Sequence, residues 1–192
     1  MVSKRGTGMR RAQKLKAVKK PAELRLDLGC GPSKREGFYG VDIRPGPGVD
    51  MGCDLRKPWP WEDGSVIEAH SSHFVEHLTG PERIHFVNEL YRVLVPGGKC
   101  QVITPHWASC RAYGDLTHQW PPVSEFWWYY LSKEWRAANA PHNDGYTCDF
   151  EATWGFSLHP QIQPRNQEYQ MHALAFWKEA AQDMIATLTK RA

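Results

Sequence analysis

The stretch from Leu26 to Ile43, LDLGCGPSKREGFYGVDI, constrains the fold of this chain more than any other. Two short apolar runs each end in an acid, and a glycine-containing loop joins them. Only six residues separate Gly31 from Phe38, whereas a crossover between parallel strands usually needs about a dozen. If both runs are parallel strands of one sheet, the first crossover helix must be nearly absent.

Short β-rich runs alternate with helical segments from Glu23 onward, which is typical of a mostly parallel sheet covered on both faces. We expect strands at residues 23–28, 38–43, 49–54, 66–71, 98–104, 149–158 and 183–190. The strongest helix spans 81–95, because Thr79 and Glu82 form a capping box and Pro96-Gly97-Gly98 ends it. A second helix is expected at 167–179.

Composition indicates one domain. The chain has 192 residues, of which 41% are hydrophobic, enough for one core. No apolar run approaches the ~18 residues that span a bilayer, and the charged N-terminus lacks the apolar part of a signal peptide. Five cysteines lie far apart without a C-x-x-C pair, so we expect no membrane contact and a reducing, cytoplasmic location.

The net charge of +3 is unevenly distributed. Residues 1–20 hold eight of the 24 Lys and Arg residues and no acid, which leaves 16 bases against 21 acids in the remainder. We expect residues 1–20 to form a basic arm and residues 21–192 the folded domain. Such an arm either contacts nucleic acid phosphates or is a solvated tail. It lacks the aromatic side chains that stack on bases.

The glycine loop favours a nucleoside ligand without phosphates. Glycines after a strand let the backbone pass close to a ligand, and an acid ending the next strand can accept hydrogen bonds from two ribose hydroxyls. The dinucleotide fingerprint G-x-G-x-x-G has its acid about 20 residues further on, whereas here the third glycine is Gly37 and Asp42 comes early. The short crossover also offers no helix N-terminus for a pyrophosphate.

Five motifs in order, DLGCGP, GVDI, CDL, SSHFVEHL and LYRVLVPGGKCQVITP, resemble the class I S-adenosylmethionine-dependent methyltransferases, in the broad branch related to the ubiquinone and menaquinone methyltransferases. The resemblance implies an α/β fold, a single Rossmann-like three-layer domain. Its mostly parallel sheet has seven strands in the order 3-2-1-4-5-7-6, and the last strand is antiparallel. This sequence departs from the pattern in its reduced first crossover helix and carries an aromatic-rich insertion after strand 5. S-adenosylmethionine is the implied cofactor.

The resemblance also implies which residues near the glycine loop bind the cofactor. Gly29, Cys30 and Gly31 would lie under its amino acid portion, and Asp27 would hold either the loop or the amino group. Asp42 would bind the ribose. Each of these residues taken alone could instead be structural, as a turn residue or a cap.

The remaining implied cofactor residues follow the later strands. Ile43 stands beside the ribose acid, Asp54 would accept a hydrogen bond from the adenine amine, and Leu55 would pack on the adenine ring. The wall beneath the sulfonium would be formed by Ser71, Ser72 and His73.

Residues 106–142 follow the fifth strand, where the resemblance places the acceptor lid. Seven aromatic rings fall between Trp120 and Trp135, and Ser124 and Ser132 indicate the starts of two short helices. We expect most of these rings to pack inward and one or two to line a pocket.

Two histidines of this segment are candidates for proton removal, which an oxygen or protonated nitrogen acceptor requires. We predict that His118, positioned by Asp115, accepts the proton and that His106 orients the acceptor. Alternatively, Asp115 and His118 pin the loop by hydrogen bonds. His70, His73 and His77 also lie close together in sequence, but their spacing puts His70 and His73 on opposite faces, so we predict no metal site.

The sequence therefore predicts a methyltransferase that acts on an oxygen or nitrogen of a small or medium acceptor. One alternative is a nucleic-acid-modifying methyltransferase anchored by residues 1–20. The chain lacks the Pro-Pro-aromatic tetrad after the fourth strand and the Pro-Cys nucleophile of such enzymes, so this alternative depends on the arm. The other alternative is a cofactor-binding protein without turnover.

Overall fold

The computed structural model describes residues 24–192. The strands are β1 (Leu24–Leu28), β2 (Tyr39–Asp42), β3 (Met51–Gly52), β4 (Val66–Ser72), β5 (Leu94–Pro105), β6 (Phe150–Leu158) and β7 (Ala181–Lys190). The helices are the 3-10 turn η1 (Val75–His77), α1 (Gly80–Val93), α2 (Arg111–Gly114), α3 (Glu125–Tyr129), α4 (Lys133–Asn139) and α5 (Gln167–Phe176). Every predicted strand is present, although β3 is shorter and β5 begins earlier than expected. The predicted basic arm, residues 1–20, lies outside the described residues.

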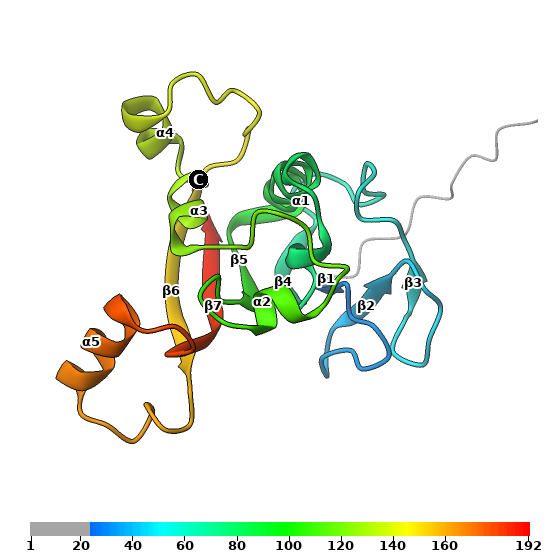
Figure 1. Cartoon of the computed structure of the whole chain (residues 1–192). Coiled ribbons are helices and arrows are strands. Elements are labelled where there is room, and N and C mark those ends of the chain that lie inside the picture. Colours follow the sequence, from blue (N-terminus) through cyan, green and yellow to red (C-terminus); the bar gives the residue numbers. More distant parts are fainter. Residues whose placement is uncertain (1–23) are drawn as a thin grey trace, which may run out of the picture.

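The strands form one sheet in the order β3-β2-β1-β4-β5-β7-β6 (Figure 1). Strands β1 to β5 pair in parallel, and β7 runs antiparallel between β5 and β6. This order confirms the predicted fold. Helices α3 and α4 lie at one end of β6 and α5 lies at its other end (Figure 1). Between residues 24 and 192, no helix has the length and apolar character needed to cross a membrane.

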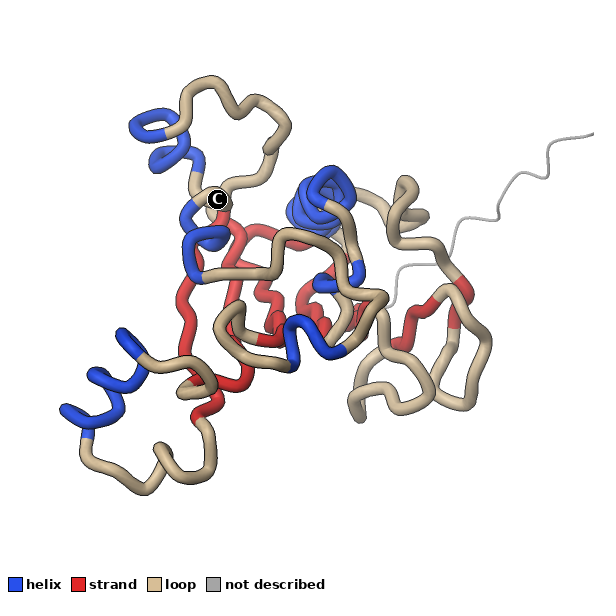
Figure 2. Tube along the Cα trace, in the orientation of Figure 1, coloured by secondary structure: helices blue, strands red, loops and turns tan. Residues whose placement is uncertain are grey.

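The first crossover contains turns and no helix between residues 29 and 38 (Figure 2), as the short spacing predicts. Gly29, Gly31 and Gly37 have φ angles of 73°, 54° and 80°, which glycine adopts at little cost. A side chain at Gly29 is also blocked sterically, because its Cβ would lie 2.4 Å from the Phe74 ring. Left-handed turns therefore replace the usual helix between β1 and β2.

Helix α1 begins at the predicted capping box. The Glu82 carboxylate accepts hydrogen bonds from the N–H and the hydroxyl of Thr79, each at 2.8 Å. The helix ends at Val93, two residues before the predicted end, because Leu94 is extended and pairs with Val66 on β4. The main core contains the buried face of α1 and apolar side chains of the sheet, among them Phe86, Val87, Leu90, Leu26, Val102 and Leu188.

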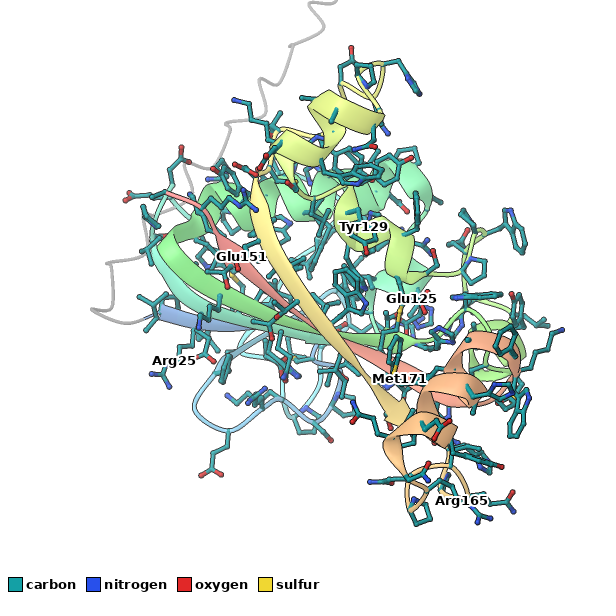
Figure 3. The ribbon with its side chains drawn as sticks, turned by 90° about the vertical axis from the view of Figure 1, so that its left-hand side faces the viewer. Arg25, Glu125, Tyr129, Glu151, Arg165 and Met171 are labelled. Carbon is teal, nitrogen blue, oxygen red and sulfur yellow. The ribbon has the colours of Figure 1, made fainter. Side chains whose placement is uncertain are left out.

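The opposite face of the sheet is polar. The strand registers align Arg25, Glu68, Lys99, Thr189 and Glu151 in one row across β1, β4, β5, β7 and β6. Arg25 and Glu151 are exposed (labelled in Figure 3), as is Lys99. The expected cover of both faces is therefore incomplete along this row. The outer strands alternate apolar and polar residues, which suits a sheet with one solvated face.

Candidate functional site

The carboxyl ends of β1, β2 and β4 bring the glycine loop, Asp42 and the residues after Ser72 to one edge of the sheet. The strand order reverses between β1 and β4. In open α/β sheets, ligands bind outside the carboxyl ends of the strands at such a switch point. This edge is the candidate site.

Asp42 and the glycine loop are in direct contact. The Oδ2 atom of Asp42 accepts a hydrogen bond from the Gly31 N–H at 3.0 Å, and Oδ1 accepts one from the Arg44 N–H at 2.8 Å. Each carboxylate oxygen can accept a second hydrogen bond, so Asp42 keeps capacity for a ligand hydroxyl. The adjacent Ile43 is 54% exposed. The structure thus brings Gly31, Asp42 and Ile43 together at the edge.

Asp27 is buried beneath the loop. Its Oδ1 lies 2.8 Å from Nδ1 of His70, and its Oδ2 accepts from the Arg35 N–H at 2.7 Å. Of its two predicted roles, these contacts match the one in which Asp27 holds the loop. The pairing with His70 was missed by sequence reasoning, although parallel strands β1 and β4 place the two residues opposite each other.

Segment 43–50 packs tightly on the glycine loop. A Cβ at Gly48 would lie 2.8 Å from the backbone of Pro32 and Lys34, and a Cβ at Gly40 would lie 2.0 Å from the Gly48 carbonyl oxygen. The Sγ of Cys30 lies 3.4 Å from that oxygen. Burial and the nearby Asp27 and Asp42 raise the pKa of Cys30 to about 11, so its thiol is neutral. Sequence reasoning missed the close packing at Gly40 and Gly48, which the Gly-Pro-Gly run at 46–48 could have indicated.

Asp54 and Leu55 have other partners than predicted. Arg56 donates to both carboxylate oxygens of Asp54, at 2.8 and 3.1 Å, and these hydrogen bonds lower the pKa of Asp54. Leu55 is buried in the main core, where its carbonyl oxygen accepts from Trp59 Nε1 at 3.0 Å. Neither side chain stands open toward a ligand in this arrangement.

The three residues predicted to form the wall beneath the sulfonium, Ser71, Ser72 and His73, differ in their exposure. Ser71 is completely buried and donates from Oγ to the Leu28 carbonyl at 2.9 Å, so its hydroxyl joins two strands. Ser72 is half-buried and His73 is exposed, with φ of 52°. Nδ1 of His73 lies 3.2 Å from Oε1 of Glu76, and this carboxylate raises the pKa of His73. Ser72 and His73 offer side-chain surface at the edge, whereas Ser71 does not.

His106 is a buried anchor of the lid segment. Its Nε2 lies 2.8 Å from Oε1 of Glu125, and its Nδ1 accepts from the Ala108 N–H at 3.2 Å. Burial acts to raise the pKa of Glu125, but the hydrogen bonds that it accepts, chiefly from His106, leave that pKa lowered. Both ring nitrogens of His106 are occupied, so this residue holds the start of the lid to α3, on which Glu125 is labelled in Figure 3.

His118 and Asp115 do not form the predicted side-chain pair. The Asp115 carboxylate accepts from the N–H and hydroxyl of Thr117, at 2.8 and 2.7 Å. Nδ1 of His118 instead lies 3.1 Å from the Ala112 carbonyl oxygen. The His118 ring meets His77 edge to face, with 4.7 Å between centroids. Asp115 therefore binds Thr117, which contacts His77 at 2.9 Å, and not the His118 ring that it was predicted to position.

Two buried charged residues at this edge were missed by sequence reasoning. Glu76 is 4% exposed, and its ligand oxygen lies within 4.8 Å of ring nitrogens of His77 and His118. Arg83 donates to the carbonyl oxygens of Val75, Pro121 and Gln119, at 3.0, 2.6 and 3.1 Å, and burial lowers its pKa. Arg83 thereby joins η1 to the loop that carries His118. Two features of the sequence could have indicated these residues. Glu76 lies within the VEH segment, and Arg83 lies on the apolar face of α1.

The aromatic-rich segment is less buried than predicted. Ser132 caps α4 by accepting from the Trp135 N–H, whereas Ser124 starts α3 without a side-chain hydrogen bond. Among the seven rings only Trp128 is fully buried. The exposed rings are Trp120, Phe126 and Tyr129. Several rings pack against one another instead of the core, as in the stacked pair of Tyr129 and Trp135, because short helices have too little inner surface for all of them.

Comparisons with known proteins give a fold but no sequence family. No family model matches this chain. An uncharacterized 37.1 kDa protein in transposon TN4556 of Streptomyces fradiae is 28% identical over 121 residues, which cover 50% of this chain and 34% of that protein. The chain thus corresponds to about a third of the length of this relative.

Solved structures of S-adenosylmethionine-dependent methyltransferases share the fold. One from Archaeoglobus fulgidus has a TM-score of 0.63 at 18% identity, covering 89% of this chain and 87% of that chain. One from Methanosarcina mazei has a TM-score of 0.54 at 15% identity, covering 91% and 95%. The [4+2]-cyclase SpnF has a TM-score of 0.53 at 16% identity, covering 88% and 75%. The fold is therefore that of class I methyltransferases, and it also occurs in a protein named for other chemistry.

Proposed function

We propose that this chain binds S-adenosylmethionine and transfers its methyl group to an oxygen or nitrogen atom of a small or medium acceptor. The observation that carries the proposal is the contact between Gly31, in the loop after β1, and Asp42, at the end of β2, beside the β1/β4 switch point. This contact joins the glycine loop, whose backbone can pass close to a ligand, to an acid that can accept hydrogen bonds from ribose hydroxyls. Between residues 29 and 38 no helix N-terminus is present to receive a pyrophosphate, which favours this cofactor over a dinucleotide.

In this proposal the cofactor extends along the carboxyl edge. Asp42 and Ile43 border the ribose, and Asp27 supports the loop from below through Arg35 and His70. Asp54 reaches the adenine amine only by sharing its oxygens with Arg56. The other residues proposed to border the cofactor are Gly29, Cys30, Gly31, Ser72 and His73, whereas the buried Leu55 and Ser71 support the site from within the fold.

The cofactor supplies a methyl carbon made electrophilic by a positively charged sulfur, and the protein has to align the acceptor and exclude water. His118 is the catalytic candidate that we propose to face the acceptor. Its neighbours hold the lid segment in place: His106 through Glu125, and Asp115 through Thr117. His106 and Asp115 therefore act as positioning residues in this proposal.

Calorimetry with the purified full chain tests the cofactor assignment. We expect S-adenosylmethionine and S-adenosylhomocysteine to bind with one site per chain, and NAD not to bind under the same conditions. Binding of NAD in place of both ligands would refute the proposal. Formation of S-adenosylhomocysteine with a panel of phenols and amines then distinguishes an enzyme from a cofactor-binding protein without turnover.

A further inference from the structure

We infer that Glu76, His77 and His118 form a site for a divalent metal ion of the zinc type. The inference goes beyond the proposed methyl transfer and can be tested without it. It differs from the prediction of no metal site, which considered His70, His73 and His77. The structure pairs His70 with Asp27 instead and brings His118 from the lid segment to His77.

The three side chains converge from two segments. Glu76 and His77 belong to η1, and His118 belongs to the loop that Arg83 holds against η1. One potential ligand atom from each residue lies within 4.8 Å of the others. Zinc bonds of 2.0–2.2 Å in a tetrahedral site put ligand atoms about 3.4 Å apart. Rotamer adjustments of about an ångström therefore close the site.

Hydrogen bonding leaves one ring nitrogen of His118 available as a ligand. The Ala112 carbonyl oxygen, 3.1 Å from Nδ1, can only accept a hydrogen bond, so Nδ1 carries the proton. A neutral imidazole then presents a lone pair at Nε2. A carbonyl acceptor on the far ring nitrogen is the usual outer contact of a metal-binding histidine.

His77 is held in the same tautomer by a relay. The Thr117 hydroxyl donates to Oδ1 of Asp115 at 2.7 Å, because a carboxylate can only accept. The same hydroxyl oxygen lies 2.9 Å from Nδ1 of His77 and accepts its proton, which leaves Nε2 with a lone pair. Asp115, predicted to position His118, thus orients His77 through Thr117.

Glu76 supplies the negative charge that a zinc ion needs. The residue is 4% exposed. Its Oε2 accepts from Thr104 Oγ1 at 3.3 Å, whereas its Oε1 is buried with no hydrogen-bond partner among residues 24–192. His73 approaches that oxygen at 3.2 Å without hydrogen-bond geometry. A buried carboxylate oxygen without a hydrogen bond is costly. A protonated His73 offsets part of this cost as an ion pair, and a bound cation would offset it further.

Two histidines and one glutamate leave the fourth tetrahedral position open, which is typical of catalytic rather than structural zinc. The open position suits an oxygen ligand such as water. If the proposed methyl transfer is correct, an acceptor hydroxyl could occupy it, and the metal would favour loss of the hydroxyl proton to solvent. This last step rests on the proposed function, whereas the metal site does not.

Zinc and cobalt titrations of the full chain test the site. Protein stripped with a chelator is titrated with Zn²⁺ in a calorimeter, and Co²⁺ is followed by its tetrahedral visible absorption. We expect one equivalent of either ion to bind. His77→Ala and His118→Ala should each weaken binding by about tenfold or more. Thr117→Val keeps all three ligands but removes the relay, and should weaken binding about 10- to 100-fold.

Matched controls separate this site from other donors. His142→Ala removes an exposed histidine outside the cluster, and Cys110→Ser removes an exposed thiol; neither change should alter the affinity. Glu76→Gln tests whether the carboxylate contributes to metal affinity. If that variant does not fold, the metal affinities of His77→Ala and His118→Ala test the site instead. S-adenosylhomocysteine affinity, measured in parallel, should be unchanged, so loss of metal binding is distinguishable from failure of the cofactor proposal.

Two outcomes would overturn the inference. The first is the absence of stoichiometric zinc or cobalt binding by the wild-type chain. The second is binding of equal affinity in wild type, His77→Ala and His118→Ala, which would place the ion on other residues.

Discussion

Gly31 donates its backbone N–H to Oδ2 of Asp42 across 3.0 Å, so the glycine loop and the acid that ends β2 form one hydrogen-bonded unit. The same Asp42 carboxylate also accepts from the Arg44 N–H. A ligand that hydrogen-bonds to Asp42 therefore meets a carboxylate already fixed in position, which reduces the entropic cost of binding.

Asp42→Ala should weaken binding of S-adenosylmethionine and S-adenosylhomocysteine by about 1–3 kcal/mol, because hydrogen bonds to a charged carboxylate are lost. Calorimetry measures the change, and circular dichroism checks that the variant is folded. Asp63→Ala alters an exposed acid at the opposite edge of the sheet and should leave affinity unchanged. An Asp42→Ala protein with wild-type affinity would remove Asp42 from the cofactor site.

Asp27→Ala should lower the free energy of unfolding by about 1–3 kcal/mol, because the buried His70 ring and Arg35 N–H lose their acceptor. Urea denaturation measures this change. Glu68→Ala is the matched control on the neighbouring strand. Its exposed pairing with Arg25 at 3.5 Å should contribute less than about 1 kcal/mol. Equal effects of the two substitutions would contradict a loop-holding role for Asp27.

Arg83→Met keeps the length and apolar contacts of the side chain but removes its donors to the Val75, Gln119 and Pro121 carbonyl oxygens. We expect loss of stability together with weaker zinc binding, because the loop bearing His118 is no longer held against η1. Limited proteolysis should cut residues 115–121 faster than in wild type. Unchanged cleavage and zinc affinity would show that Arg83 does not hold this loop.

Acid sensitivity should depend on Glu89. Its hydrogen bonds with Arg92, at 2.8 Å, and then with the Trp59 N–H hold the pKa of Glu89 below its ordinary value of 4.5. A carboxyl with a lowered folded-state pKa stabilises the fold above its ordinary pKa, and this contribution is lost as the pH falls below that value.

Glu89→Gln should therefore be less stable than wild type at neutral pH and should lose less stability between neutral pH and about pH 3. Thermal unfolding over this range measures both effects. The exposed Glu62→Gln serves as control and should follow the wild-type curve. Parallel curves for Glu89→Gln and wild type would exclude Glu89 as a contributor to acid sensitivity.

Local sequence signals predicted most of the helices and strands along the chain. The capping box of Thr79 and Glu82 located the start of α1 because both partners lie in one turn. The six residues between Gly31 and Phe38 predicted turns in place of a crossover helix because chain length alone forbids one. The resemblance to class I methyltransferases supplied the sheet order, and the Gly31–Asp42 contact follows from adjacent parallel strands.

The exposure of the aromatic rings in the lid segment depends on side-chain packing, which the spacing of residues along the sequence does not specify. Trp127 and Trp128 are neighbours in the chain, yet only Trp128 reaches the main core as a buried residue. A helix as short as α3 can be rotated about its axis without changing its own hydrogen bonds. The surrounding residues therefore decide which ring turns inward.

The amino-acid sequence by itself determined the strands, the glycine loop and the acid that closes β2, because each depends on residues near in the chain or on strand periodicity. Only the tertiary structure decided the partners of the histidines. His118 meets His77 rather than Asp115, and this contact requires the loop after β5 to fold back on η1, where Arg83 holds it. Contacts between distant segments depend on three-dimensional placement of the backbone, which residue spacing along the chain does not specify.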